Sequence, residues 1–313
     1  MSAAVDGVSD HTKTEEVRKR PLENTQLLLD NGAQVDARDE DGNTPLILAA
    51  KGTRRPEYIQ LLIENGAAVN AQDRNGVTPL MLAIHERGLP EIVKILIEKG
   101  AQVDAHSNSG STPLHRAAQA SISNFYVPER MRTEVRKGPL ETTQLLLNYG
   151  APVDARDEDG NTPLILAAKG TSRPEYIQLL IENRAEVNAR NNDGWTPLMI
   201  AARGSGWHYD SRNEYRSGRL ILAVKGSDKL EFIQLLIEGG AEVNARNNDG
   251  WTPLMIAARW CNNSEIILWL LDNGADATAE NKLGKKAIYL ARNYNKALKD
   301  TRALERLEQL AGE

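Results

Sequence analysis

A five-residue pattern, Gly-x-Thr-Pro-Leu, recurs six times in the 313-residue chain and limits what the chain can fold into. Its copies begin at Gly42, Gly76, Gly110, Gly160, Gly194 and Gly250. The basic interval between successive copies is about 34 residues, and two of the intervals are longer because of insertions. A fixed period of this length is typical of repeat proteins, in which each unit packs against its neighbours. The six complete units are 39–72, 73–106, 107–156, 157–190, 191–246 and 247–280.

The first complete unit illustrates how one repeat is expected to fold. A turn at Gly42 is followed by Thr44, a preferred helix N-cap residue, and by Pro45, which suits the first position of a helix. A second, more apolar helix begins at Pro56 and ends at Gly66, where glycine favours the left-handed conformation of a helix C-terminus. A pair of helices this short is marginal in water, so several pairs must stack to bury a common core.

These units resemble ankyrin repeats through the pattern Asp-x-x-Gly-x-Thr-Pro-Leu-x-x-Ala-Ala, followed by an apolar helix and Gly-Ala-x-Val-Asn/Asp-Ala. The resemblance covers roughly residues 39–280. It implies an all-α repeat fold, an ankyrin-type α-solenoid of helix-turn-helix units with short β-hairpin loops. The histidine that follows Thr-Pro-Leu in such repeats, and makes a local structural hydrogen bond there, is kept only as His115. The other units have Ile47, Met81, Ile165, Met199 and Met255 at this position.

The flanks and two insertions depart from the regular repeat. Residues 16–38 match residues 134–156, so we expect a disordered N-terminus over 1–14 and a half-repeat over 15–38. Residues 281–313 keep the repeat spacing but lose Thr-Pro, and their polar last helix predicts a C-terminal capping repeat. The insertions lie near 119–138 and 203–219. Arg184 replaces the glycine that ends the second helix of other units, and a positive φ there would cost about 1 kcal/mol.

Two identical stretches of nineteen residues, 185–203 and 241–259, each place a tryptophan directly after Asp-Gly. Identical copies indicate a recent duplication, so the repetition itself carries no chemistry. The tryptophans are Trp195 and Trp251, and the resemblance implies that their position lines the concave surface of the stack. Tryptophan is enriched in binding hot spots, which makes both candidate partner-binding residues; the alternative is that each indole covers a neighbouring hairpin. The equivalent positions, which are weaker candidates, are Asn43, Val77, Ser111 and Asn161.

The insertions form a second candidate surface because they are rich in aromatic and basic residues. Their aromatic residues are Phe125, Tyr126, Trp207, Tyr209 and Tyr215. Such a composition fits protein recognition, the stacking of single-stranded nucleic acid, or the packing of the loops on their own helices.

Three further features have both a functional and a structural interpretation. The acidic triplets 39–41 and 157–159 could attract calcium or a basic partner, or simply order their hairpins. The resemblance implies that Asn70, Asn188 and Asn244 occupy a position that can be hydroxylated, whereas the structural alternative is hairpin ordering. The five histidines and the single Cys261 form no catalytic or metal-binding pattern, and no phosphate-binding loop is present, so we expect no enzyme, cofactor or metal.

The net charge and composition of the chain narrow the kind of partner that it can bind. A formal net charge of −5 argues against general binding of nucleic acid, and no apolar segment is long enough for membrane insertion. One cysteine and no signal-peptide core predict a cytoplasmic protein, with signal-independent secretion left open. We expect a monomer without a small-molecule substrate.

The predicted function is a non-catalytic protein–protein interaction scaffold that uses the concave surface and the two long loops. The alternatives are an inhibitor or regulator that covers the active site of an enzyme, and a host-directed effector.

Overall fold

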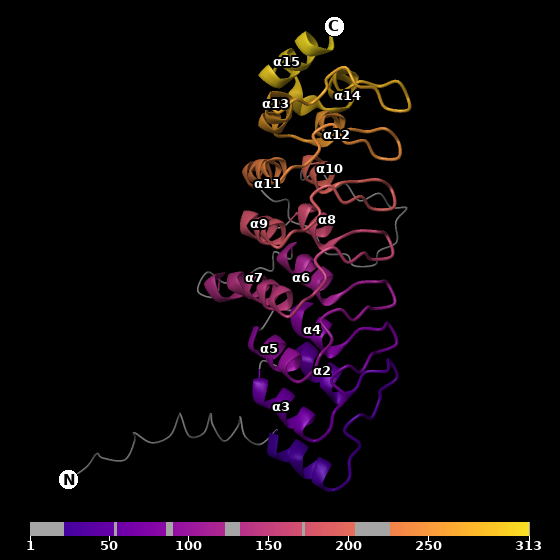
Figure 1. Ribbon diagram of the computed structural model, residues 1–313, viewed down its shortest axis with the longest axis vertical. Helices are drawn as coiled ribbons and strands as arrows, with labels where there is room; N and C mark the ends of the chain where they lie inside the picture. The colour runs from indigo at the N-terminus through magenta and orange to yellow at the C-terminus, as the bar shows by residue number, and fades with distance from the viewer. Residues whose placement is uncertain are drawn as a thin grey trace, which may run out of the picture.

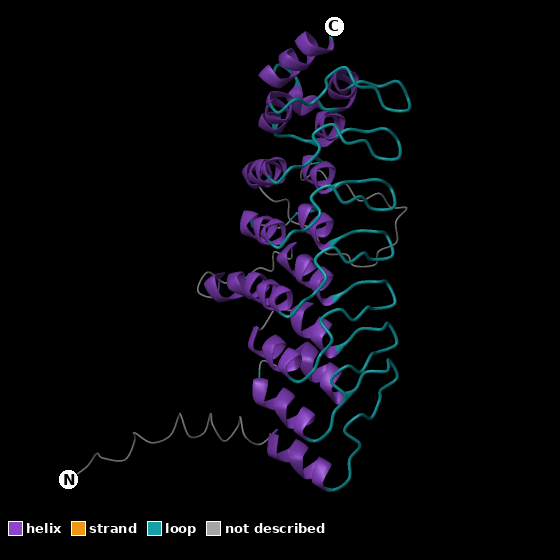
Figure 2. Ribbon diagram, viewed as in Figure 1, coloured by secondary structure: helices purple, strands orange, loops and turns teal. Residues whose placement is uncertain are grey.

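The computed structural model describes residues 22–52, 55–85, 90–122, 132–170, 173–203 and 226–312. Within these ranges the regular elements are all helices, and loops with turns but no strand connect them (Figure 2). The predicted all-α solenoid is therefore confirmed, although its projecting hairpins are held by turns and not by strand pairing. The segment 1–14 and the centres of both insertions lie outside the described residues.

The helices stack in two layers that run the length of an elongated molecule (Figure 1). The inner layer lies beside the hairpin loops, and each of its helices packs on the next. It contains α2 (Pro45–Gly52), α4 (Pro79–His85), α6 (Pro113–Ile122), α8 (Pro163–Ala168), α10 (Pro197–Ala202), α12 (Pro253–Trp260) and α14 (Ala287–Tyr294). The outer layer contains a helix over 22–30, α3 (Pro56–Glu64), α5 (Pro90–Glu98), α7 (Arg132–Asn148), α9 (Pro174–Glu182), α11 (Gly226–Glu238), α13 (Ser264–Asp272) and α15 (Arg302–Ala311). A short 3₁₀ turn, η2 (Lys296–Leu298), joins α14 to α15.

Local sequence sets the start of each inner helix. The hydroxyl oxygen of Thr162 accepts a hydrogen bond from the backbone N–H of Ile165, and the next residue, Pro163, opens α8. Thr196 and Thr252 cap α10 and α12 in the same way. These caps satisfy backbone donors that a helix N-terminus leaves unpaired, so the Thr-Pro pair fixes where each inner helix begins.

The hairpins bond to one another along the stack. The backbone N–H of Asn192 donates to the carbonyl of Asp159 at 3.0 Å, and that of Asn248 donates to Asp193 at 3.1 Å. Gly160 makes this approach possible, because it has a φ of +74° and a Cβ added there would lie 2.9 Å from the backbone nitrogen of Asn192. The repeated Asp-Gly therefore serves both the turn and the contact between neighbouring repeats.

Arg184 has a φ of 67°, so it adopts the left-handed conformation at the end of α9 for which the sequence predicts a steric cost. We expect Arg184→Gly to raise the free energy of unfolding by up to about 1 kcal/mol, because glycine adopts this conformation without steric strain. Urea denaturation of the two proteins measures the difference.

The control lies at the equivalent position of an earlier repeat. Gly66 has a φ of +88° with no atom within 4 Å of an added Cβ, so Gly66→Ala should lower the stability through backbone strain alone. A loss of stability in Arg184→Gly would contradict this account of the helix end.

Candidate functional site

Trp195 and Trp251 stand where a hairpin meets an inner helix, directly before the caps of α10 and α12. Both are half-buried and pack on the hydrophobic core. The side-chain oxygens of Asn191 and Asn247 each accept a hydrogen bond from the tryptophan backbone N–H at 2.9 Å. The hairpins thus fix the backbone from which each indole projects.

An arginine at the C-terminal end of the inner helix lies beside each tryptophan. Arg203 follows Trp195 by eight residues, and Arg259 follows Trp251 by the same interval, which corresponds to two turns of a helix. The Arg203 guanidinium carbon lies 5.8 Å from the Trp195 ring centroid, and that of Arg259 lies 5.4 Å from the Trp251 centroid. Each duplicated stretch therefore contributes a cation stacked on its own tryptophan.

Trp260 links the two stacks into one row. Its ring lies 5.1 Å from the Trp251 ring at an interplanar angle of 29°. The guanidinium carbons of Arg203 and Arg259 lie 5.2 Å and 4.8 Å from the Trp260 centroid. The rings and cations of two neighbouring repeats are therefore in continuous contact.

The row continues onto the last inner helix. Arg259 lies 4.6 Å from the ring centroid of Tyr294 in α14, and Tyr294 meets Tyr289 edge-on at 6.3 Å. Tyr294 is 54% exposed and Tyr289 36%. The Lys285 ammonium lies 3.9 Å above the Tyr289 ring and ends the row. We call this set the aromatic ladder; it consists of Trp195, Arg203, Trp260, Trp251, Arg259, Tyr294, Tyr289 and Lys285.

The ladder is an ordered surface that keeps its charges. Burial lowers the pKa of Arg203, yet a guanidinium retains its proton throughout the physiological range. Each cation–ring contact contributes about 0.5–1 kcal/mol at an exposed site and about 2 kcal/mol where water is excluded. These contacts hold the side chains in place before any ligand arrives, so a ligand would lose little additional side-chain entropy on binding.

The tryptophans were found from the sequence, but their partners in the ladder were not. Arg203 and Arg259 could have been noticed because each follows a tryptophan by two helical turns. Trp260 and Tyr294 are one repeat period apart, and both are aromatic. Paired aromatics at the repeat period were the signal that could have revealed them.

The other predicted surface positions are more enclosed. Val77, Ser111 and Asn161 are buried, and Asn43 is half-buried. The amide nitrogen of Asn161 donates to the Asp157 carboxylate at 3.2 Å and its oxygen accepts from the Asn191 amide at 3.1 Å, so this side chain is hydrogen-bonded to its own hairpin and to the next one. The aromatic residues of the insertions lie outside the described residues; they are Phe125, Tyr126, Trp207, Tyr209 and Tyr215.

The hairpin asparagines connect consecutive repeats. The Asn188 amide nitrogen donates to the carbonyl of Gly240 at 3.0 Å, and its oxygen accepts from the N–H of Glu242 at 2.8 Å. Asn70 and Asn244 make the same pair of bonds to their following repeats. This arrangement supports the structural interpretation of these residues, and their hydroxylation stays a prediction.

The acidic triplets also take part in hairpin structure. The Asp39 carboxylate accepts hydrogen bonds from the side chain and backbone of Asn43, and these bonds hold the pKa of Asp39 below its ordinary value. Among the residues that the structure describes, no cluster of three or more metal-ligating side chains occurs. Cys261 is buried, and burial raises the pKa of its thiol, which disfavours the nucleophilic thiolate.

His115 is hydrogen-bonded within its own repeat through Nδ1 and to the next repeat through Nε2. Its Nδ1 accepts from the backbone N–H of Thr112 at 3.2 Å, so the proton lies on Nε2, which donates to the carbonyl of Asn161 at 2.9 Å. Burial lowers the pKa of His115 below its ordinary value of 6.5. The folded protein therefore favours the neutral ring.

We expect this histidine to make the protein less stable in mild acid. As pH falls below 6.5 the unfolded chain binds a proton at His115 that the folded chain does not, so stability decreases by at most about 1.4 kcal/mol per pH unit. The variant His115→Met should lose the part of the pH dependence of stability that His115 causes, because methionine does not titrate. Methionine fits the site, since it occupies the equivalent position at Met199. Urea denaturation of both proteins at pH 7 and pH 5 measures the change in the free energy of unfolding. An equal change in both proteins would show that His115 does not cause the loss of stability in acid.

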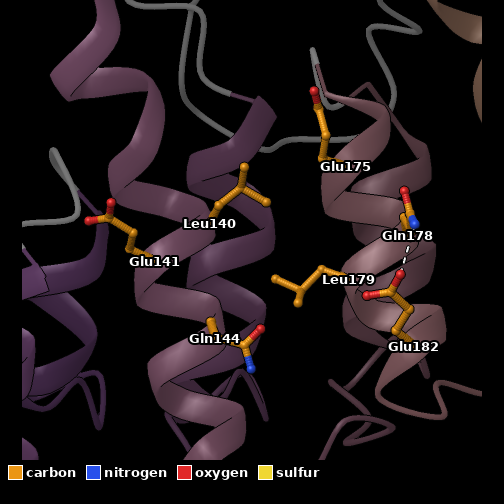
Figure 3. Close-up of a pocket in the computed structure, with 7 residues that line it drawn as sticks. All are labelled: Leu140, Glu141, Gln144, Glu175, Gln178, Leu179 and Glu182. Carbon is orange, nitrogen blue, oxygen red and sulfur yellow. Dashed lines mark hydrogen bonds between the residues drawn. The ribbon is translucent and has the colours of Figure 1, made fainter.

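The outer layer holds an open pocket of about 400 Å³ between α7 and α9 (Figure 3). Its lining consists of Leu140, Glu141, Gln144, Glu175, Gln178, Leu179 and Glu182. Gln178 donates to Glu182 at 2.7 Å, along the same helix. The lining contains carboxylates, amides and leucines but no serine, threonine, cysteine, lysine or histidine.

Comparison with known proteins agrees with this architecture. A family model described as ankyrin repeats in three copies matches residues 17–107, 59–126, 133–211 and 206–281. The crystal structure of the human ASB11 ankyrin repeat domain has a similar fold, with a TM-score of 0.63 and 24% sequence identity over 87% of this chain and 99% of that one. No curated protein matches the chain significantly. In the described part of the chain, none of the helices has the length and apolarity needed to cross a bilayer. The chain belongs to the ankyrin repeat family.

Proposed function

We propose that the protein is a non-catalytic scaffold that binds a partner protein along the aromatic ladder. Ankyrin repeats generally mediate protein–protein interaction. The observation that carries the proposal is the continuous contact of three tryptophans with Arg203 and Arg259 across neighbouring repeats. Tryptophan, tyrosine and arginine dominate binding hot spots, and the ladder contains all three in an ordered, partly exposed row.

The two faces of the molecule would have different roles. The inner helices α10, α12 and α14 would contact the partner, and the outer helices would support them. A partner covering the ladder and adjoining hairpins would bury about 800 Å² on each side, the size of an ordinary specific interface. We also propose a cytoplasmic location, which is supported by the single cysteine of the sequence.

Site-specific photo-cross-linking in the native cell tests the proposal. A benzoylphenylalanine at Tyr294, which is 54% exposed, should capture a discrete partner protein. The matched control places the same group at the exposed Gln178 of the outer helix α9, where capture of that partner should be absent. Equal capture at both positions, or capture at Gln178 alone, would contradict an interface on the inner helices.

A further inference from the structure

We propose that Asn75 is a site of spontaneous covalent modification, at which the side-chain amide is converted to aspartate or isoaspartate. The net reaction consumes water and releases ammonia, so it needs no enzyme and no oxidant. Asn75 lies on the hairpin of the second complete repeat and is not part of the aromatic ladder, so the modification does not depend on the proposed function.

Asparagine is one of the chemically labile residues of proteins, and a following glycine makes it more so. Glycine has no side chain to obstruct its own backbone nitrogen. This nitrogen loses its proton and attacks the asparagine Cγ, and the amide group takes up a proton and leaves as ammonia. Water then opens the resulting succinimide ring at either carbonyl. The chain has four such pairs, all within the described residues: Asn31-Gly32, Asn65-Gly66, Asn75-Gly76 and Asn273-Gly274.

Three of the four asparagines directly follow an outer helix and are tethered to it by their own side chains. The amide nitrogen Nδ2 donates to the backbone carbonyl four residues earlier, at 2.7 Å for Asn31 and at 2.8 Å for Asn65 and Asn273. To bring Cγ to the glycine nitrogen, the side chain must rotate, and this rotation breaks the hydrogen bond. The tether therefore slows ring closure at these three sites.

The exposed side chain of Asn75 has no such tether. It makes no hydrogen bond within the described part of the chain, where only the backbone N–H of Asn75 donates, to Asp73 Oδ1 at 2.8 Å. The N–H of Gly76 donates to the Asp73 carbonyl at 3.0 Å, and the glycine N–H of the other three pairs makes an equivalent bond at 2.9 to 3.1 Å. The attacking nitrogen is thus similarly bound in all four pairs, and the freedom of the amide distinguishes Asn75.

Isoaspartate at this position would disturb the contact between neighbouring hairpins, because its backbone contains an additional methylene. The carbonyl of Asn75 accepts a hydrogen bond from the backbone N–H of Asn108 at 2.8 Å. A Cβ added to Gly76 would lie 2.8 Å from that same nitrogen, so the two hairpins are too close to accept a further backbone atom without displacement. The isoaspartate product should therefore loosen the join between the second and third complete repeats.

Peptide mapping by mass spectrometry, after the whole protein is incubated in mildly alkaline buffer, tests the proposal. In the folded protein we expect Asn75 to convert about fivefold faster than any of the other three asparagines, a factor that corresponds to one hydrogen bond of about 1 kcal/mol. In concentrated urea, where no tether remains, the four rates should become similar. A protein isoaspartate methyltransferase labels the isoaspartate product. Asn75→Gln should remove most of this label, because glutamine would have to close a larger ring.

Three results would overturn the proposal. Conversion of Asn31, Asn65 or Asn273 at least as fast as that of Asn75 in the folded protein would show that the tether does not control the reaction. No conversion of Asn75 would show that the hairpin holds its backbone too rigidly for ring closure. A preference for Asn75 that persists unchanged in urea would assign it to the local sequence and not to the structure.

The effect on the hairpins is tested with Asn75→Asp, which has the charge of the product without the additional methylene. Hydrogen–deuterium exchange in the hairpins of the second and third complete repeats should be faster in the aged protein than in this variant. Equal exchange in the two proteins would contradict the loss of contact between the hairpins.

Discussion

The Tyr176→Ala variant will lose about 3–5 kcal/mol of unfolding free energy, as expected when a large aromatic side chain is removed from a packed core. Tyr176 is fully buried in α9, and its hydroxyl oxygen lies 3.0 Å from Thr143 Oγ1 on the neighbouring α7. Packing against α7 and α11 on either side excludes water from the ring. The midpoint of urea denaturation, followed by circular dichroism, measures the loss.

The chain supplies a matched control for this experiment. Tyr58 occupies the same position in α3, whose sequence is identical to that of α9, and its hydroxyl lies 2.7 Å from Thr25 Oγ1. Tyr58 is only half-buried, so Tyr58→Ala should cost about half as much. Tyr176→Phe, which removes only the hydroxyl, should cost about 1 kcal/mol. Equal losses at Tyr58 and Tyr176 would contradict the view that neighbouring repeats, and not the local sequence, bury the ring.

Replacing Trp195 and Trp251 together with alanine will weaken binding of the partner at least about a hundredfold. A hot-spot tryptophan commonly contributes about 2 kcal/mol or more, and two such losses exceed a factor of about a hundred even when they are not fully additive. The substitution also removes rings on which Arg203 and Arg259 stack, so both arginines lose their fixed orientation. Isothermal titration calorimetry with the partner captured at Tyr294 gives the affinity.

This binding experiment needs a control for loss of fold and for general loss of aromatic surface. Circular dichroism and the thermal midpoint establish that the double variant keeps its helices. Tyr149→Ala removes an aromatic side chain that is 47% exposed directly after the outer helix α7 and is not part of the ladder, so it should leave affinity unchanged. A folded double variant with unchanged affinity would exclude the tryptophans as anchors.

The architecture was predictable because the features that determine it are local and repeated. Thr162 and Pro163 start a helix by hydrogen bonding and backbone geometry alone, and the same pair recurs at Thr196 and Thr252. Asp-Gly fixes the turn and permits contact between hairpins. A short-range signal of this kind becomes decisive when it recurs at a constant period.

The ladder was predictable only in part because it depends on contacts between repeats. Trp260 lies at the end of one inner helix and Tyr294 at the end of the next, and only the stacking register brings Arg259 between them. Contacts between repeats also determine burial in the core. Tyr58 and Tyr176 lie in helices of identical sequence, yet Tyr176 is buried and Tyr58 is half-buried because their neighbouring repeats differ. Sequence periodicity identifies equivalent positions, but the register of the stack decides which of them touch.

Hydrogen–deuterium exchange of the complex tests most directly whether the inner helices of the C-terminal repeats bind the partner. We expect slower exchange on binding in residues 190–203, 246–260 and 285–294, with no change in the outer helices α9, α11 and α13. Slower exchange confined to these outer helices, or to the repeats before α6, would contradict the account.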